Sequence, residues 1–206
     1  MLRGFISDRW WLLLFGMLLG GCGFSSASME MPEWDPATAA DRALTEYDSN
    51  GDRKLARDEL KKCPGLLSSI KDFDQDADGS ISGEELKSKL QEILGSGPAL
   101  VELACVVTRS GRPVEGATVK MVPEPFMGET FQPATGVTER NGTAYPSISQ
   151  ETMPEEYRGR IQGVHTGIYR VEVTHPNVAV PAKYNTQTEL GQVVTLRTRD
   201  ALTVNF

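Results

Sequence analysis

The chain has 206 residues, a formal net charge of −7 and 39% hydrophobic residues. This length is enough for one or two domains. The negative charge argues against nucleic acid as a partner on electrostatic grounds, and the hydrophobic content suits a globular protein rather than one that spans a membrane many times.

The N-terminal segment has the pattern of a secretory signal. Arg3 and Arg9 supply basic charge, and residues 10–19 are almost wholly apolar. This apolar core is too short to cross a bilayer as a helix, which takes about 20 residues. We therefore expect residues 1–21 to be a signal peptide that is not part of the fold.

The end of this segment, Leu19-Gly20-Gly21-Cys22, resembles the lipobox of bacterial lipoproteins. The resemblance implies cleavage before Cys22 and lipid on that cysteine, so that acyl chains anchor the mature protein to a membrane. In bacteria that retain lipoproteins in the inner membrane by an Asp after this cysteine, Gly23 would favour the outer membrane. The alternative is an ordinary signal peptide or N-terminal anchor with an incidental cysteine. Residues 22–34, rich in small and polar side chains, are expected to be a tether.

The first helix is predicted to follow the tether. Asp35 suits the N-cap and Pro36 the first helical position. Apolar residues then recur at helical spacing on one face. They are Ala39, Ala40, Ala43, Leu44 and Tyr47.

Residues 48–59 form a first candidate metal-binding loop. Side-chain oxygens lie at positions 1, 3, 5 and 12, and position 7 could add its backbone carbonyl. These residues are Asp48, Asn50, Asp52, Glu59 and, at position 7, Lys54. Arg53 lies at position 6, where a left-handed conformation costs a non-Gly residue about 1–2 kcal/mol. Ala56 at position 9 has no side-chain oxygen. Both weaken the site, and the alternative is a degenerate loop that only packs.

Residues 74–85 form a second candidate loop that matches the pattern more fully. Its expected ligands are Asp74, Asp76, Asp78, the carbonyl of Ser80, Ser82 directly or through water, and both oxygens of Glu85. Gly79 at position 6 permits the positive φ of a sharp turn. Ca²⁺ takes about six to eight oxygen ligands at roughly 2.3–2.6 Å, and alternate residues of a tight loop can supply them. The alternative is a solvated acidic loop.

Further short helices are expected around the loops. We predict a helix over residues 58–62, a break at Cys63-Pro64-Gly65, and a second helix whose apolar face includes Leu66 and Phe73. The helix after the second loop carries Leu86, Leu90, Ile93 and Leu94 at helical spacing.

The two loops resemble those of the EF-hand family, and residues 35–95 are expected to form an EF-hand pair. The resemblance implies Ca²⁺ as the cofactor. Leu55 and Ile81, at position 8 of each loop, should pair as a short β-bridge. Loop two offers four formal negative charges and loop one three, so loop two should bind calcium more tightly.

The remainder, residues 99–206, is β-rich. Strands are expected over residues 100–108, 117–122, 135–138, 143–145, 168–173, 192–197 and 202–206. Asn141-Gly142 predicts a hairpin turn between the third and fourth strands. Residues 146–163 are expected to form a long surface loop, with a partner-binding loop as the alternative.

Several segments of this region resemble transthyretin-like and carboxypeptidase-regulatory-like domains. They are residues 111–119, 136–142, 167–171 and 181–185. The resemblance implies a stalk, adhesion or binding role. The predicted fold class is α+β in two domains, an all-α EF-hand pair followed by an all-β transthyretin-like (Ig-like) sandwich.

The sequence contains no familiar catalytic motif such as HExxH or GxSxG. His165 and His175 are expected to be loop residues rather than metal ligands. If Cys22 carries lipid, Cys63 and Cys105 could form one disulfide. Two separate buried thiols are favoured, because Cys63 lies at a helix end and Cys105 within a strand.

These features together predict a non-enzymatic, calcium-binding, lipid-anchored protein of the cell envelope that faces the periplasm or the exterior. Its role would be structural, or binding of an envelope protein or polysaccharide. One alternative is a calcium-responsive regulatory module that opens an apolar groove for a partner protein. Another is an envelope hydrolase, which would need a polar cluster in a cleft of the β-region.

Overall fold

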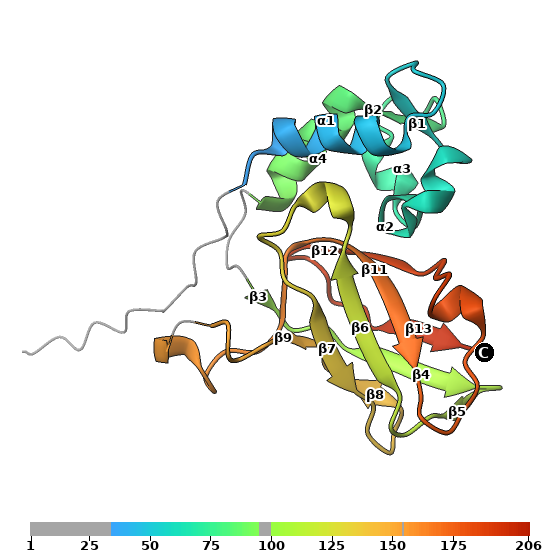
Figure 1. Ribbon diagram of the computed structural model, residues 1–206, viewed down its shortest axis with the longest axis vertical. Helices are drawn as coiled ribbons and strands as arrows, with labels where there is room; N and C mark the ends of the chain where they lie inside the picture. The colour runs from blue at the N-terminus through green and yellow to red at the C-terminus, as the bar shows by residue number, and fades with distance from the viewer. Residues whose placement is uncertain (1–33, 95–99, 154) are drawn as a thin grey trace, which may run out of the picture.

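A computed structural model describes residues 34–94, 100–153 and 155–206, with a helical region at one end and a β-region at the other (Figure 1). The predicted signal peptide, the lipidation site Cys22 and the tether up to residue 33 lie outside the described residues. Within the part that is described, no helix is both long and apolar enough to cross a membrane.

The first helix, α1 (Pro36–Tyr47), begins where the sequence predicts. The Asp35 side chain accepts hydrogen bonds from the N–H groups of Ala37 and Thr38, at 3.3 and 2.9 Å. It thereby caps donors that have no partner within the helix. The five predicted apolar residues of α1 are all buried, and the helix packs along α4 (Gly83–Leu94).

The chain between the two loops folds into shorter pieces than predicted. Residues 59–62 form a 3₁₀-helix, η1 (Glu59–Lys62), and the expected second helix is divided into α2 (Pro64–Leu67) and α3 (Ile70–Phe73). Pro64 disfavours helical geometry at the residue before it, and Cys63 has φ −128° and ψ 74°. Ser69, with φ −124°, interrupts the helix a second time.

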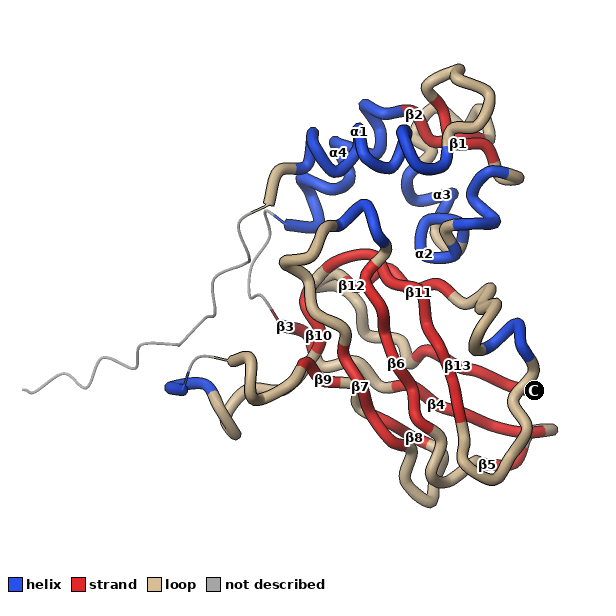
Figure 2. The backbone as a smooth tube through the Cα atoms, in the orientation of Figure 1, coloured by secondary structure: helices blue, strands red, loops and turns tan. Residues whose placement is uncertain are grey.

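Two three-residue strands join the candidate loops. β1 (Lys54–Ala56) pairs antiparallel with β2 (Ser80–Ser82), and Leu55 lies opposite Ile81, which confirms the predicted bridge. Both of these side chains are fully buried. The pair lies at the end of the helical region farthest from the β-region (Figure 2), and it fixes one loop relative to the other.

The largest sheet has five antiparallel strands in the order β12-β11-β6-β7-β9. Their bounds are β6 (Thr118–Pro123), β7 (Ala134–Val137), β9 (Ser147–Ile148), β11 (Gly167–Thr174) and β12 (Gly191–Val194). A 3₁₀-helix, η2 (Pro125–Met127), follows β6 and rises toward α1 (Figure 1).

A second sheet has the order β13-β4-β5, with β8 also paired to β4. Its strands are β4 (Cys105–Arg109), β5 (Arg112–Pro113), β8 (Thr143–Ala144) and β13 (Leu202–Asn205). β13 runs parallel to β4. β3 (Leu100–Val101) and β10 (Val164–His165) form a separate antiparallel pair. Two more 3₁₀-helices are η3 (Glu155–Tyr157) and η4 (Ala182–Tyr184).

The predicted hairpin at Asn141-Gly142 is wrong. The turn is present, but β7 pairs with β6 and β9, whereas β8 pairs with β4 of the other sheet. The buried Thr138, just after β7, donates through Oγ1 to the Val114 carbonyl at 2.6 Å and accepts from the Ala117 N–H at 2.8 Å. These bonds hold the end of β7 beside the segment that leads into β6, and the chain turns at residues 139–142 before β8 joins the second sheet.

The predicted fold class, an all-α pair followed by an all-β transthyretin-like (Ig-like) sandwich, is also wrong. The described part of the N-terminal region has short α-helices, the 3₁₀-helix η1 and the β1–β2 sheet, and the other strands lie in several sheets. Phe126, Met127 and Ile168 of the β-region belong to the same buried cluster as the apolar faces of α1 and α4. The chain is a mixed α+β protein, because the helices complete their burial against the β-region.

Strand β12 passes very close to α2. A Cβ atom on Gly191 would lie 1.8 Å from the Pro64 carbonyl oxygen, and one on Gly65 would lie 2.6 Å from Cγ2 of Ile168. A side chain at either glycine would push the helical region away from the sheet. Glycine at these two positions therefore permits the joint between the regions.

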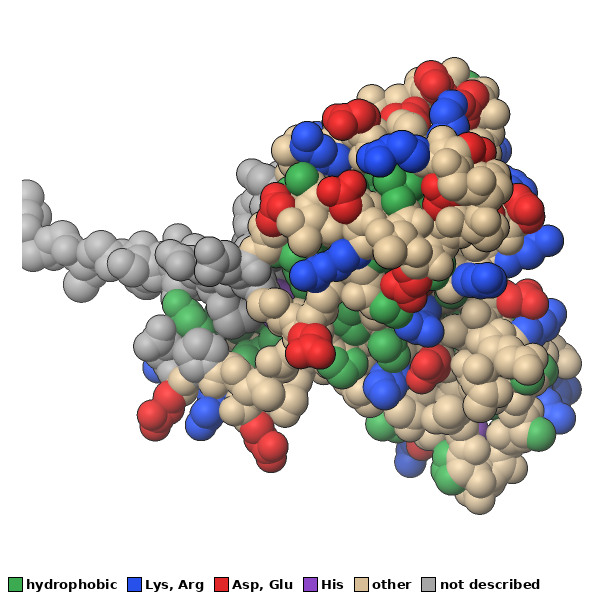
Figure 3. Space-filling view, turned by 45° about the horizontal axis from the view of Figure 1, so that its top comes forward, with side chains coloured by type: hydrophobic (Ala, Val, Ile, Leu, Met, Phe, Trp, Pro, Cys, Tyr) green, Lys and Arg blue, Asp and Glu red, His purple; other side chains and the backbone are tan. Residues whose placement is uncertain are grey.

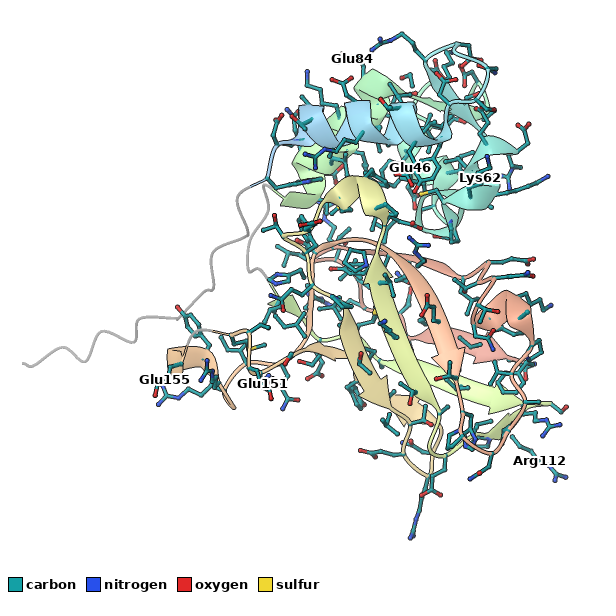
Figure 4. The ribbon with its side chains drawn as sticks, in the orientation of Figure 1. Glu46, Lys62, Glu84, Arg112, Glu151 and Glu155 are labelled. Atoms are coloured by element: carbon teal, nitrogen blue, oxygen red, sulfur yellow. The ribbon has the colours of Figure 1, made fainter. Side chains whose placement is uncertain are left out.

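The predicted surface loop over residues 146–163 is only partly irregular. It begins with β9, buries Met153 and includes η3. Figure 4 shows Glu151 and Glu155 on a projection away from both sheets.

The favoured state of the two cysteines agrees with the structure, in which Cys63 and Cys105 are separate, buried thiols.

Candidate metal site

Three carboxylates of the second loop converge. One oxygen each of Asp74, Asp76 and Asp78 lies within 4.8 Å of the others. In the ranges that the structure describes, no other three or more His, Cys, Asp or Glu side chains converge in this way. Oxygen donors of this kind suit hard cations, so the cluster could hold a metal ion.

Backbone N–H groups turn these carboxylates inward. Gly79 donates to Asp74 at 2.9 Å, and Ser80 donates to Asp78 at 2.9 Å. The turn that permits this has positive φ at Ala77 (59°) and Gly79 (92°). Glycine adopts this conformation freely, whereas the same conformation strains alanine.

Glu85 ties the ends of the second loop together. Its Oε1 accepts hydrogen bonds from the N–H groups of Gln75 and Asp76, at 2.8 and 3.2 Å, and its Oε2 accepts from the N–H and the hydroxyl of Ser82, at 2.8 and 2.7 Å. Partial burial raises the pKa of Glu85, but the hydrogen bonds from these partners outweigh it and lower the pKa below its ordinary value. Both oxygens of this predicted ligand thus accept hydrogen bonds from the loop itself, and Glu85 is not among the carboxylates that converge.

The backbone of the first loop has the same left-handed positions as that of the second, but its glycine lies at the other of the two. Asp48 accepts hydrogen bonds from the N–H groups of Gly51 and Arg53, at 2.7 and 2.8 Å. Their φ angles are 76° and 63°, so positions 4 and 6 are left-handed in both loops. Loop one has its glycine at position 4 and loop two at position 6. The left-handed conformation expected at Arg53 is confirmed.

Several side-chain oxygens of the first loop accept hydrogen bonds from other groups of the same loop. Asn50 Nδ2 donates to Asp52 Oδ2 at 3.0 Å. Glu59 closes the loop by accepting from the N–H groups of Ser49 and Ala56, at 2.8 and 2.9 Å. The hydrogen bonds from Ala56 and Ser49 lower the pKa of Glu59, although burial works against them. The predicted ligands of loop one lie in order around the turn without a converging group of three carboxylates.

Lys54, predicted to offer only its carbonyl to loop one, reaches into loop two. Its Nζ forms an ion pair with Asp78 Oδ2. The hydrogen bond from Lys54 lowers the pKa of Asp78, and the same bond raises the pKa of Lys54. Lys54 lies opposite Ser82 in the β1–β2 register. A basic residue beside the predicted Leu55 bridge, facing an acidic loop, is the sequence signal that could have indicated this contact.

A buried carboxylate at the joint between the two regions was not predicted. The side chain of Glu124 is fully buried; Oε1 accepts from the Gly65 N–H at 2.8 Å, and Oε2 lies 3.8 Å from Arg170 Nε. Burial raises the pKa of Glu124, and Gly65 and Arg170 oppose that shift. Figure 4 labels Glu46, whose charge also raises the Glu124 pKa, at this junction below α1.

The histidines have roles in packing and turns. His175 Nδ1 accepts from the N–H groups of Asn177 and Val178 at 2.9 Å each, within the loop where it was predicted. His165 lies in β10 rather than in a loop, edge-on to Phe131 with ring centroids 6.2 Å apart. On the face in Figure 3, acidic and basic side chains are interspersed over the helical region.

Comparisons of the chain with protein-family models, with curated proteins and with solved structures found no match.

Proposed function

We propose that the chain is a calcium-binding protein whose main site is the loop Asp74–Glu85, with a weaker site in Asp48–Glu59. The observation that carries this proposal is the convergence of three aspartates in the loop that Glu85 closes. Mg²⁺ demands near-ideal octahedral geometry and keeps several waters, whereas Ca²⁺ accepts six to eight oxygens from a flexible loop. A protein-built set of carboxylates, carbonyl and hydroxyl suits Ca²⁺ better.

Each residue of the main site has a distinct task. Asp74, Asp76 and Asp78 supply the charged oxygens, and Ser80 its carbonyl. Ser82 acts directly or through water, and also orients Glu85 through its hydroxyl. A bound calcium ion would offset the repulsion among these carboxylates, and it would stabilise the folded chain because it binds only the folded loop.

Packing of the helical region supports a structural role for calcium. A sensor must expose an apolar groove when it binds the ion. Here Phe126, Met127 and Ile168 already cover the apolar faces of α1 and α4. Opening the helices would separate them from the β-region. The calcium-responsive alternative therefore predicts stronger binding of an apolar dye on calcium addition, and unchanged dye binding would exclude it.

The N-terminal sequence supports a place at the cell envelope. We extend the proposal to a lipid anchor on Cys22, in the outer membrane, and to a structural or binding role toward an envelope protein or polysaccharide. Fatty-acid labelling tests the anchor. Label that persists in Cys22→Ser would refute it.

Calcium titration of the mature chain tests the two sites. Asp74→Ala should weaken binding at loop two about tenfold or more, since lost interactions with charged groups cost about 1.5–3 kcal/mol. Asp48→Ala should remove a weaker site and cost less total affinity. Isothermal titration calorimetry measures both, and Asp200→Ala, an exposed aspartate of the β-region, is the control. A larger loss from Asp48→Ala than from Asp74→Ala would contradict the assignment of the main site.

A further inference from the structure

Lys54 connects the two candidate loops through its side chain. It belongs to β1 of the first loop, yet its ammonium group is paired with Asp78 of the second. The side chains of Lys54 and Asp78 are 42% and 32% exposed, so the ion pair is partly shielded from solvent. The register that places Lys54 opposite Ser82 holds this ammonium at the edge of loop two.

Both carboxylate oxygens of Asp78 are engaged. Oδ1 accepts the Ser80 N–H at 2.9 Å, and Oδ2 pairs with Lys54. Asp78 is also one of the three aspartates that converge within 4.8 Å. The ammonium therefore offsets part of the repulsion among three neighbouring carboxylates, as a cation tethered to the chain.

We infer that the Lys54 ammonium competes with the metal ion at loop two. It stabilises the loop in the absence of calcium and lowers the affinity of the loop for calcium. This inference rests on the proposed calcium site. A metal ion that takes Asp78 Oδ2 as a ligand competes with the ammonium for that oxygen, because both cations are attracted to the same carboxylate. The charge of Lys54 then remains near the ion and repels it.

Two effects of opposite sign distinguish this role from ordinary packing. Lys54→Met keeps an unbranched side chain of similar size and the backbone carbonyl but removes the charge. Without calcium, it should lower the thermal unfolding midpoint, since the aspartates lose their counter-charge. With calcium, it should bind the ion at loop two about two- to fivefold more tightly, the range expected for a partly exposed ion pair. Lys54→Arg, which retains the charge, should stay close to the wild type in both measurements.

The experiment uses calcium chloride and the mature chain in about 0.15 M salt, where charges beyond about 8 Å are screened. Isothermal titration is repeated in an Asp48→Asn background, so that the measured heat comes from loop two. Lys120→Met, an exposed lysine of β6, controls for the loss of one positive charge elsewhere.

The outcomes separate the two hypotheses. Tighter calcium binding together with lower calcium-free stability in Lys54→Met supports the competitor role. Calcium binding by the wild type with equal or weaker binding by Lys54→Met overturns that role and leaves the calcium site standing. The absence of calcium binding in every variant overturns the proposed function, and the role of Lys54 with it.

Discussion

At the scale of single residues, the two loops differ in where each places its glycine. Both need positive φ at positions 4 and 6, and each has a non-glycine residue at one of them: Arg53 in loop one and Ala77 in loop two. The side chain of Arg53 gains little in return, because it lies 3.9 Å from Asp41 with both groups largely exposed. Arg53 is therefore a strained residue with no compensating contact of comparable strength.

This strain predicts an order among three substitutions that all remove the charge. Arg53→Gly should be more stable than Arg53→Ala by about 1 kcal/mol, with Arg53→Asn between them, since asparagine tolerates the left-handed region better than alanine. Chemical denaturation without calcium measures the order. Equal stability of the glycine and alanine variants would show that φ at this position carries no strain.

At the scale of elements, the β1–β2 pair is the physical link between the loops. Leu55 and Ile81 lie opposite each other and are fully buried. The strands also bring the Lys54 side chain to loop two. Changes in one loop can therefore reach the other through three residues of strand on each side.

Shortening the Leu55 side chain in this strand pair should affect both stability and metal binding. Leu55→Ala should destabilise the protein by about 2–5 kcal/mol, the usual cost of emptying a buried leucine site. It should also weaken calcium binding at both loops. Leu202→Ala, a half-buried leucine of β13, should cost less stability and leave calcium affinity unchanged. Denaturation and calorimetry measure the two effects, and unchanged calcium affinity in Leu55→Ala would show that the loops bind independently of the bridge.

At the scale of the whole molecule, the joint between the helical region and the β-region is a shared core with a buried carboxylate in it. Glu124 follows β6 and accepts a hydrogen bond from Gly65 of α2. Cys63, Arg170 and Glu46 are among the titratable or charged groups whose interactions with Glu124 bear on its pKa. Arg170 favours the charged form, whereas burial and Glu46 disfavour it.

Substitutions can separate two contributions of Glu124 to stability, its hydrogen-bond acceptor and its buried charge. Glu124→Ala leaves the Gly65 N–H without a partner and should cost about 1–3 kcal/mol for the hydrogen bond alone. Glu124→Gln keeps an acceptor oxygen and removes the buried charge, so it should be much milder at neutral pH. Chemical denaturation of both variants without calcium provides the comparison. An equal loss in the two would show that the charge, rather than the acceptor, holds the joint.

The pH dependence of stability shows whether the charge of Glu124 stabilises or destabilises the folded protein. The folded-state pKa of Glu124 is raised above its ordinary value by burial. The folded protein then binds more protons than the unfolded chain, so the contribution of Glu124 to stability declines as pH rises from the ordinary glutamate pKa, about 4.3, toward the raised one. The stability of Glu124→Gln relative to the wild type should therefore increase over that range. A relative stability that falls with pH would reverse the assignment.

Much of the candidate site is readable from the sequence, because its signals are local. The loop positions, the N-cap at Asp35 and the opposition of Leu55 and Ile81 all follow from spacings within a few residues or from a repeated pattern. The order of oxygens in residues 74–85 predicts the convergence that the structure has. The left-handed conformation at Arg53 is likewise set by its place in the turn.

Only the tertiary structure decides what depends on distant partners. Lys54 and Asp78 are 24 residues apart in the sequence, and Gly65 and Glu124 are 59 apart. The sheet that each short strand joins also depends on distant pairing, so the strands on either side of the Asn141-Gly142 turn lie in different sheets. An apolar helix face predicts that this face will be buried, but it does not identify the residues that cover it. Here the β-region completes the burial, so one core crosses the boundary that composition alone suggested.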